Sequence, residues 1–173
     1  MEIRKATAAD LAAVDAIYGE IHDAEERGAA TVGWKRGVYP IAETAEAALS
    51  RGDLFVQEDG GKIVGTGIIN QLQLDEYRDA AWLYAAEDRE VMVLHTLVIS
   101  PRAAGKGYGR AFAEFYGEYA RGHGCRVLRI DTNEKNAAAR ALYRKLGYRE
   151  ADVTPCVFNG IGGVRLVLLE KRI

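Results

Sequence analysis

Apolar residues in the first part of the chain recur at the spacing of an amphipathic helix. Between Leu11 and Ile21 they fall three or four positions apart, which places them on one helix face. Thr7, followed three residues later by Asp10, forms a capping-box-like start to this helix. The pattern therefore predicts a helix that begins near Leu11 and ends near Gly28.

The rest of the chain alternates between short apolar runs and further helical stretches. The predicted strands cover residues 2–5, 54–56, 63–69, 91–99, 127–130, 153–157 and 164–169, and the other predicted helices cover residues 44–51, 109–121 and 136–146. We expect a loop over residues 33–40 and a turn at Asp59-Gly60-Gly61, whereas residues 74–89 show no pattern that assigns them. Without a repeat or a linker, this order indicates one α+β domain over residues 1–173 on a single sheet.

The strongest strand signal is the run from Val91 to Ile99, which is apolar at almost every position. Such a run is typical of a central strand that is buried on both faces. It leads through Ser100-Pro101 into Gly105-Lys106-Gly107-Tyr108-Gly109, after which a helix begins. Glycines let backbone N–H groups approach an anion closely, and a helix start adds unpaired donors. The alternative is a strand-to-helix turn that needs glycine for its geometry alone.

Two well-known phosphate-binding motifs do not match this turn. A P-loop requires Ser or Thr after its lysine, whereas Lys106 is followed by Gly107. The dinucleotide-binding fingerprint requires a third glycine at the position of Arg110, and it belongs near the start of a βαβ unit. Neither motif therefore explains the turn.

Composition and charge narrow the classes of protein that remain. Charged residues make up 28% of the chain and the net charge is −2, so the bulk balance points to neither a nucleic-acid nor a membrane partner. No apolar run reaches membrane-spanning length and the N-terminus lacks a signal stretch, which predicts a soluble cytoplasmic protein. Cys125 and Cys156 are isolated and are expected to be reduced, and the scattered histidines predict no metal site.

Two segments together carry a resemblance to a known family. Residues 99–109, Ile-Ser-Pro-Arg-Ala-Ala-Gly-Lys-Gly-Tyr-Gly, resemble the acyl-CoA loop of the Gcn5-related N-acetyltransferase (GNAT) family. Residues 136–148, Asn-Ala-Ala-Ala-Arg-Ala-Leu-Tyr-Arg-Lys-Leu-Gly-Tyr, resemble that family's second signature, in the same order and spacing. The resemblance implies one mixed, mostly antiparallel sheet with helices on both faces, in which two central strands splay apart.

The resemblance implies acetyl-CoA as the co-substrate. The main chain of Leu97, Val98 and Ile99 would bind the pantetheine arm and the thioester carbonyl, and Asn136 matches an asparagine that contacts this arm. The remaining contacts would come from the glycine turn and its flanks, namely Ala104, Gly105, Lys106, Gly107, Tyr108, Gly109 and Arg110. The family usually has Arg or Gln at the position of Ala104, so the expected grip there is by backbone amides, with Arg102 as a candidate substitute.

Tyr143 and His95 are the candidate catalytic residues. Tyr143 matches the position that often carries the general acid in this family, and a phenol is a plausible donor to a thiolate. The alternative is a tyrosine that only packs. Leu94-His95-Thr96-Leu97 resembles a strand of serotonin N-acetyltransferases whose histidine is linked to deprotonation of the amine. The alternative there is a histidine satisfied in the core, with a water chain as the base.

The loop after the first helix builds the acceptor pocket in this family. Trp34, Arg36 and Tyr39 form an aromatic and cationic cluster there, which suits an acceptor with an apolar body or a carboxylate. Alternatively, the two rings only anchor the loop. Asp131 and Asn133, which follow the fifth strand, either line the site or act as cap and turn residues.

The expected reaction is direct attack of a primary amine on acetyl-CoA in a ternary complex. The acceptor is a small molecule or a peptide, and the sequence leaves open whether the protein forms a homodimer. Two alternatives remain from the sequence: a non-catalytic CoA-binding or regulatory module on the same scaffold, and a peptide or protein N-terminal acetyltransferase.

Overall fold

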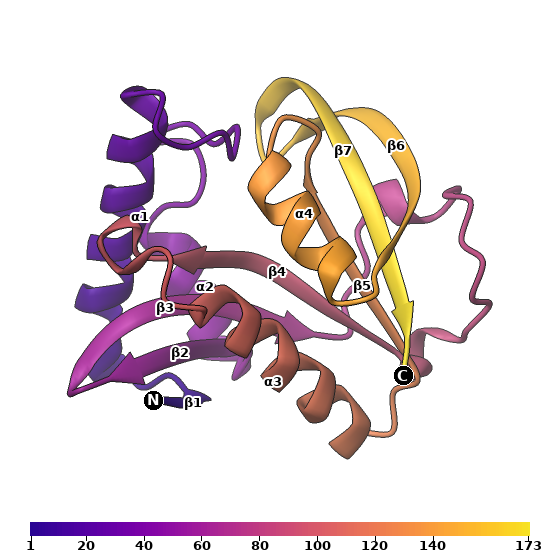
Figure 1. Cartoon of the computed structure of the whole chain (residues 1–173), viewed down its shortest axis with the longest axis horizontal. Helices are drawn as coiled ribbons and strands as arrows, with labels where there is room; N and C mark the ends of the chain where they lie inside the picture. Colours follow the sequence, from indigo (N-terminus) through magenta and orange to yellow (C-terminus); the bar gives the residue numbers. More distant parts are fainter.

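The computed structural model describes residues 1–173, which form one seven-stranded sheet flanked by α-helices (Figure 1). The strands are β1 (Glu2–Lys5), β2 (Leu54–Asp59), β3 (Lys62–Asn70), β4 (Val91–Ile99), β5 (Val127–Asn133), β6 (Arg149–Phe158) and β7 (Ile161–Arg172). The helices are α1 (Leu11–Glu26), α2 (Ala42–Arg51), α3 (Tyr108–Gly122) and α4 (Ala137–Lys145). The strand order is β1-β2-β3-β4-β5-β7-β6, and only β4 and β5 are parallel. The predicted mixed, mostly antiparallel sheet is confirmed.

All the predicted helices and strands occur, and the differences lie at their ends. The largest concerns β6 and β7, which pair from Arg149 opposite Glu170 to Phe158 opposite Ile161. The strands extend beyond the predicted apolar runs because most of the residues at their ends are polar or glycine, which the apolar pattern does not include. At the N-terminus, the Asp10 carboxylate accepts hydrogen bonds from the Thr7 backbone N–H at 2.8 Å and from its hydroxyl at 3.0 Å.

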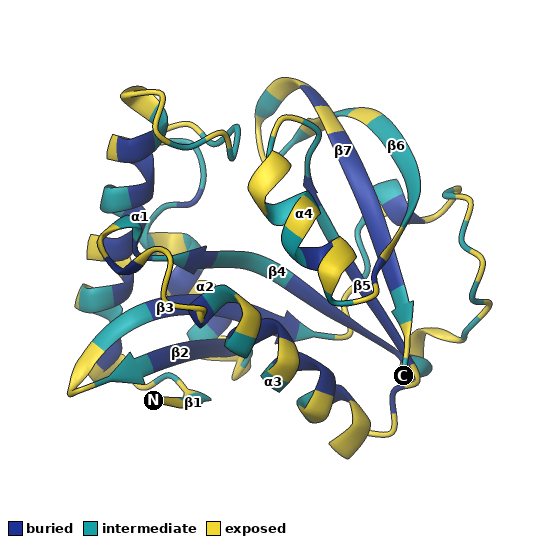
Figure 2. Ribbon diagram, in the orientation of Figure 1, coloured by how far each residue is buried: buried dark blue, intermediate teal, exposed yellow.

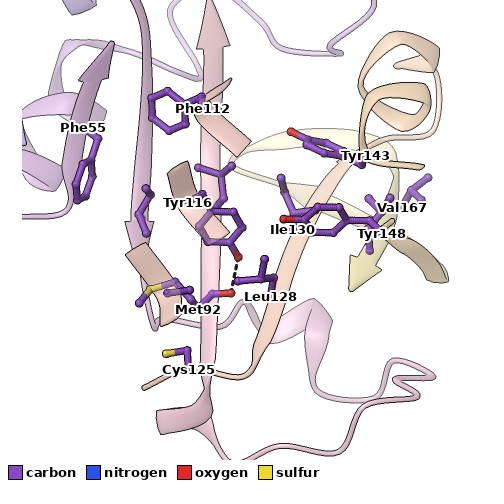
Figure 3. Packing of buried hydrophobic residues seen from close by; sticks show 14 residues of the cluster. Phe55, Met92, Phe112, Tyr116, Cys125, Leu128, Ile130, Tyr143, Tyr148 and Val167 are labelled. Atoms are coloured by element: carbon purple, nitrogen blue, oxygen red, sulfur yellow. Dashed lines mark hydrogen bonds between the residues drawn. The ribbon is translucent and has the colours of Figure 1, made fainter. Parts of the chain in front are cut away.

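Helices cover both faces of the sheet, as predicted. On one face α3 and α4 contribute Phe112, Tyr116 and Tyr143 to the largest cluster of buried side chains (Figure 3). On the other face α1 and α2 contribute Val14 and Ala48 to a second cluster. Figure 2 shows the buried residues along the middle of the strands and on the inner sides of these helices. None of the helices is both long and apolar enough to cross a membrane.

The segment without a sequence pattern, residues 74–89, closes a third cluster over β4, β5 and β7. Its Tyr77 is buried together with Val93 and Leu168. The carboxylate of Glu170 accepts hydrogen bonds from the N–H groups of Leu83 at 2.8 Å and Tyr84 at 3.2 Å. Apart from the short 3₁₀ helices Asp75–Tyr77 and Asp88–Glu90, the segment is irregular, and side-chain contacts of this kind hold it against the sheet.

The parallel strands β4 and β5 separate partway along their length (Figure 1). They pair only from Val91 opposite Val127 to Leu94 opposite Ile130. Beyond this point β4 continues beside β3 and β5 continues beside β7. Where the two strands pair, the Tyr116 hydroxyl lies within hydrogen-bond distance of both, 2.5 Å from the carbonyl oxygen of Met92 in β4 and 3.0 Å from that of Arg129 in β5. The predicted splay of the central strands is therefore present.

Candidate functional site

The separation of β4 and β5 opens into a cavity of about 370 Å³. The cavity is lined by residues of β3, β4, β5, α2, α4, the loop after α1 and the β6–β7 hairpin. It brings together six of the residues predicted for the site, namely Trp34, Tyr39, His95, Leu97, Asn136 and Tyr143. A largely apolar cavity with a few polar groups is typical of a small-molecule site.

β4 carries a β-bulge where it borders the cavity. The single residue Gly67 of β3 lies opposite two residues of β4, Thr96 and Leu97. Thr96 has a φ of 49°, which is rare for a β-branched residue and indicates local strain. Its hydroxyl forms a hydrogen bond with the Tyr39 hydroxyl, which ties the loop after α1 to the bulge. Such bulges re-aim strand residues beside functional sites.

The glycine turn presents an uninterrupted row of backbone donors. The N–H groups of residues 105–110 donate no hydrogen bond to any acceptor within the chain. Gly105 and Gly107 have φ values of 81° and 80°, and Gly107 caps α3. Free N–H groups at the start of a long helix suit an anion such as a diphosphate. The turn follows the end of β4 and does not line the cavity itself.

Side chains from two other elements hold the glycine turn in place. The Tyr108 hydroxyl donates to Asp59 at 2.7 Å. The carboxylate of Glu20 in α1 forms an ion pair with Arg102 at 3.2 Å and accepts a hydrogen bond from the Ser100 hydroxyl at 2.5 Å. The guanidinium of Arg102 is therefore directed to α1. Because Ala104 has no polar side chain, the turn offers only its backbone N–H groups at this position. Arg110 pairs with a carboxylate of its own helix at 2.8 Å.

His95 is partly buried and lines the cavity together with Arg51 of α2. Its Nε2 lies 3.1 Å from the side-chain oxygen of Asn70. Burial lowers the pKa of His95 to about 4, and the charge of Arg51 acts in the same direction. The imidazole is therefore neutral at physiological pH.

Tyr143 reaches the cavity from α4. Its ring packs 5.6 Å from that of Tyr148, next to Ile130 (Figure 3). Its hydroxyl has no hydrogen-bond partner within the chain and is not sealed in the core. Burial raises the pKa of Tyr143, and the carboxylate of Asp131 raises it further. The phenol therefore keeps its proton and is available as a donor.

Asp131 is one of two cavity residues, with Asn133, that the sequence did not distinguish from cap and turn residues. It directly follows Ile130, the last residue of β5 that pairs with β4. Its carboxylate accepts a hydrogen bond from the Tyr77 hydroxyl at 2.7 Å and forms no salt bridge. Burial raises the pKa of Asp131 to about 7, against the opposing effect of this hydrogen bond. The available sequence signal was an acidic residue at the end of a buried strand.

The loop after α1 and the β6–β7 hairpin supply an aromatic wall. The rings of Trp34 and Tyr39 lie 5.9 Å apart edge to face, and Phe158 lies 6.5 Å from Tyr39. Gly33 of the same loop packs closely against Asn133. A Cβ at this glycine would lie only 2.2 Å from the Asn133 amide nitrogen, so the close approach requires glycine. All five residues line the cavity.

Arg36, the third residue predicted for the acceptor pocket, lies outside the cavity. Its guanidinium pairs with Asp23 at 2.5 Å and with Glu26 at 2.8 Å on the surface of α1. The neighbouring Glu25 accepts hydrogen bonds from the N–H groups of Val32 at 2.8 Å and Gly33 at 3.0 Å. These contacts hold the loop, and they leave Arg36 no role inside the cavity.

Comparison with known proteins agrees with this geometry. The sequence model of the acetyltransferase (GNAT) family matches residues 18–148 of this chain. An uncharacterized N-acetyltransferase of Methanocaldococcus jannaschii is 32% identical over 99 residues, which cover 57% of this chain and 40% of that protein. The matched region is thus less than half of that relative's length.

Solved structures share the whole fold. A ribosomal-protein-alanine N-acetyltransferase from Brucella melitensis is 25% identical, covers 100% of both chains and superposes with a TM-score of 0.74. An acetyltransferase from Salmonella typhimurium, solved with its cofactor acetyl-CoA, is 23% identical, covers 99% of this chain and 93% of its own, and has a TM-score of 0.71.

Proposed function

We propose, because the chain belongs to the GNAT acetyltransferase family, that it transfers the acetyl group of acetyl-CoA to a primary amine by direct attack in a ternary complex. One observation carries the proposal. The strand that borders the opening, β4, runs into the row of free amides at residues 105–110, and the opening itself holds Tyr143, His95 and Asp131. The free amides lie beyond the end of β4, and the candidate proton-transfer groups lie in the cavity beside it, so one strand connects the two.

The donor side of the gap fits the co-substrate, which supplies the acetyl group and a thiol leaving group. The amides of residues 105–110 would hold the diphosphate. From His95 to Ile99 the edge of β4 that faces β5 has no partner strand, so its main chain can bind the pantetheine arm. The Asn136 side-chain oxygen accepts from the N–H of Ala139 at 3.2 Å, which leaves its NH₂ group as a donor to the same arm.

Asp131 and Tyr143 form a matched pair for the two proton transfers. Asp131 takes one proton from the acceptor ammonium, which frees the nitrogen lone pair to form the C–N bond. Tyr143 donates a proton to the thiol sulfur as the C–S bond breaks, and it is reprotonated by the second proton that the nitrogen loses. Since the Asp131 carboxylate raises the pKa of Tyr143, protonation of Asp131 lowers that pKa and makes the phenol a better donor.

Asp131 suits the role of base better than His95, which the sequence left as a candidate base alongside a water chain. A general base works best when its pKa lies near the working pH. The pKa of Asp131 is about 7 and that of His95 is about 4, so an imidazole in this place accepts a proton from an ammonium only against a steep gradient. In our proposal His95 contributes as a neutral hydrogen-bond acceptor in the cavity.

The lining of the cavity selects the class of acceptor. The carboxylate of Asp131 has no cationic partner within the chain, whereas Arg51, which also lines the cavity, is paired with Asp53 at 2.9 Å. The wall that contains Trp34 and Phe158 is aromatic. We therefore propose a primary amine with an apolar body, bound by its ammonium group at Asp131.

The N-terminus of a peptide is the second candidate acceptor. The similarity to the Brucella melitensis ribosomal-protein-alanine N-acetyltransferase favours it, because that match extends over the whole of both chains. A peptide acceptor would carry the same amine to Asp131 and would extend out of the cavity.

An acceptor panel tests these proposals. The protein is mixed with acetyl-CoA and, in turn, with 2-phenylethylamine, phenylalanine and an alanine-initiated peptide, and both thiol release and acetylated product are measured. We expect 2-phenylethylamine to react faster than phenylalanine, whose carboxylate is repelled by Asp131. Preference for the peptide would select the second candidate. Binding of acetyl-CoA without transfer to a broad range of amines would contradict an enzymatic role and favour a CoA-binding module.

Tyr143→Phe tests the acid. We expect kcat to fall by about 100-fold while the affinity for acetyl-CoA is kept, because only the proton donor is lost. Tyr148→Phe is the matched control: the Tyr148 ring packs against the Tyr143 ring, and its hydroxyl is buried without a hydrogen-bond partner. Equal activity of Tyr143→Phe and the control would remove Tyr143 from this role.

A further inference from the structure

A chain of polar side chains extends from His95 across two neighbouring strands. Asn70, the last residue of β3, lies between His95 of β4 and Asp53, which directly precedes β2. The Asn70 Nδ2 donates to Asp53 Oδ2 at 3.0 Å, and Asn70 Oδ1 lies 3.1 Å from His95 Nε2. The backbone reinforces this arrangement, because the N–H of Ile69 donates to the carbonyl oxygen of Asp53 at 3.0 Å.

The orientation of the Asn70 amide is fixed at both ends. A carboxylate only accepts hydrogen bonds, so the NH₂ group of Asn70 must face Asp53. A backbone N–H only donates, and that of Leu72 donates to Asn70 Oδ1 at 2.9 Å. Arg51 holds the same Asp53 oxygen at 2.9 Å, which fixes the far end of the chain. The oxygen of Asn70 therefore faces His95.

This orientation decides which imidazole nitrogen carries the hydrogen. Asn70 Oδ1 only accepts hydrogen bonds, so its 3.1 Å contact with Nε2 is a hydrogen bond only if Nε2 carries the hydrogen, whereas an unprotonated Nε2 would set two lone pairs against each other. The Leu72 backbone lies near enough to the imidazole to raise the pKa of His95, but it forms no hydrogen bond of ordinary geometry with either ring nitrogen. The contact between Nε2 and Asn70 therefore determines the tautomer. His95 Nδ1 has no hydrogen-bond partner within the chain and is not sealed in the core.

We propose that Asn70, oriented by Asp53, is a positioning residue that holds His95 as the Nε2–H tautomer and leaves Nδ1 as a hydrogen-bond acceptor for the attacking amine. The kinetic part of this inference rests on the proposed function. An acceptor atom at a fixed place in the cavity takes one N–H of the neutral amine and so orients the nitrogen lone pair. No proton is transferred in this step, and the imidazole stays neutral.

Nitrogen-15 NMR of the whole protein tests the tautomer without any need for turnover. Long-range proton–nitrogen correlations distinguish a protonated from an unprotonated imidazole nitrogen, and His95→Gln identifies the signals of His95 among those of His22 and His123. At neutral pH we expect a protonated Nε2 and an unprotonated Nδ1. A protonated Nδ1 would overturn the inference even if the protein proves to be an active acetyltransferase, and the expected pattern would stand even if it does not.

A double-mutant cycle tests the positioning role. Asn70→Ala should lower kcat at least tenfold in the wild-type background, by loss of the correct tautomer, with little change in the KM for acetyl-CoA. In the His95→Gln background it should have no further effect, because Asn70 acts through His95. An equal loss in both backgrounds would show that Asn70 has a merely structural role.

Gln71→Ala is the matched control for this cycle. Gln71 is the neighbouring amide, and it donates to the carbonyl oxygen of Arg89 at 2.8 Å and to the sulfur of Cys125 at 3.3 Å, outside the cavity. We expect this variant to keep the wild-type kcat and the wild-type imidazole signals.

Discussion

Single residues in the cavity owe their proton affinities to their surroundings. The same burial that raises the pKa of Asp131 to about 7 lowers that of His95 to about 4, because burial disfavours the charged form of each group. The pKa of this carboxyl group therefore lies above that of the imidazole, which reverses their usual order. For a base that works near neutral pH, this reversal makes the carboxylate the better candidate.

The pH dependence of kcat/KM tests this reversal. Asp131 acts as a base only when ionised, so activity should fall as the pH drops through about 7, the pKa of this group in the folded protein. Asp131→Asn should remove that acidic limb and lower the plateau by about 100-fold. The measurement is a pH series with one acceptor for both proteins.

The control for this series is Glu76→Gln. The charge of Glu76 raises the pKa of Asp131, so its removal should move the acidic limb to lower pH without abolishing it. An acidic limb near pH 4 that survives Asp131→Asn and disappears in His95→Gln would instead assign the base to His95, one of the two candidates that the sequence left open.

Elements place these residues by ending or distorting at the right points. β4 pairs with β5 only as far as Leu94, and its bulge at Thr96 follows directly. At its end the chain makes the turn that starts α3, with Gly107 in the left-handed region. Close packing adds a second constraint, since a Cβ on Gly109 would lie 3.4 Å from Leu142 of α4. One strand therefore supplies both the edge of the cavity and the entry to the anion site.

Gly107→Ala tests the donor row at the element scale. An alanine at a φ of 80° is strained by roughly 1 kcal/mol, and relief of this strain would turn the N–H groups of the turn away from a common point. We expect the affinity for acetyl-CoA, measured by calorimetry, to fall about tenfold or more.

Gly124→Ala is the matched control. Gly124 has a φ of 75° and, like Gly107, open space where a Cβ would project, but it lies in the turn after α3. It should lose similar stability and keep its affinity for acetyl-CoA. Equal affinities of the two variants would contradict the role of the turn in binding the co-substrate.

The whole molecule depends on three clusters of buried side chains, of which only two lie under helices. The third lies under residues 74–89, which are fastened by Glu170. The Glu170 side chain is 0% exposed and also pairs with Arg149 at 2.6 Å. A buried carboxylate with several donors is costly to disrupt, because each donor loses its partner.

Glu170→Ala should therefore lower the free energy of unfolding by about 3 kcal/mol. Glu118→Ala, which removes an exposed partner of Arg121 on α3, should change it by less than about 0.5 kcal/mol. Urea unfolding measures both. A loss below about 1 kcal/mol for Glu170→Ala would show that residues 74–89 are held mainly by their apolar contacts.

The sequence by itself determined the elements and, through the two GNAT signatures, the mixed sheet and the residues proposed for the donor side of the site. Apolar runs and helical spacing depend on neighbours along the chain, and so does the order of the two GNAT signatures. The sequence also singled out Tyr143 and His95, both of which line the cavity. Residues 74–89 escaped this kind of reading, because their contacts are with Glu170 and Leu168, far away in the sequence.

Only the tertiary structure decided which residues form the part of the cavity proposed for the acceptor. It placed Asp131 next to the free end of the β4–β5 pairing, gave its carboxylate a partner in Tyr77, and left it without a cation. It also kept Arg36 outside the cavity by pairing it on α1, although the sequence put it beside Trp34. Burial, proton affinity and the direction of a side chain depend on segments that meet only in the fold, and no local pattern encodes them.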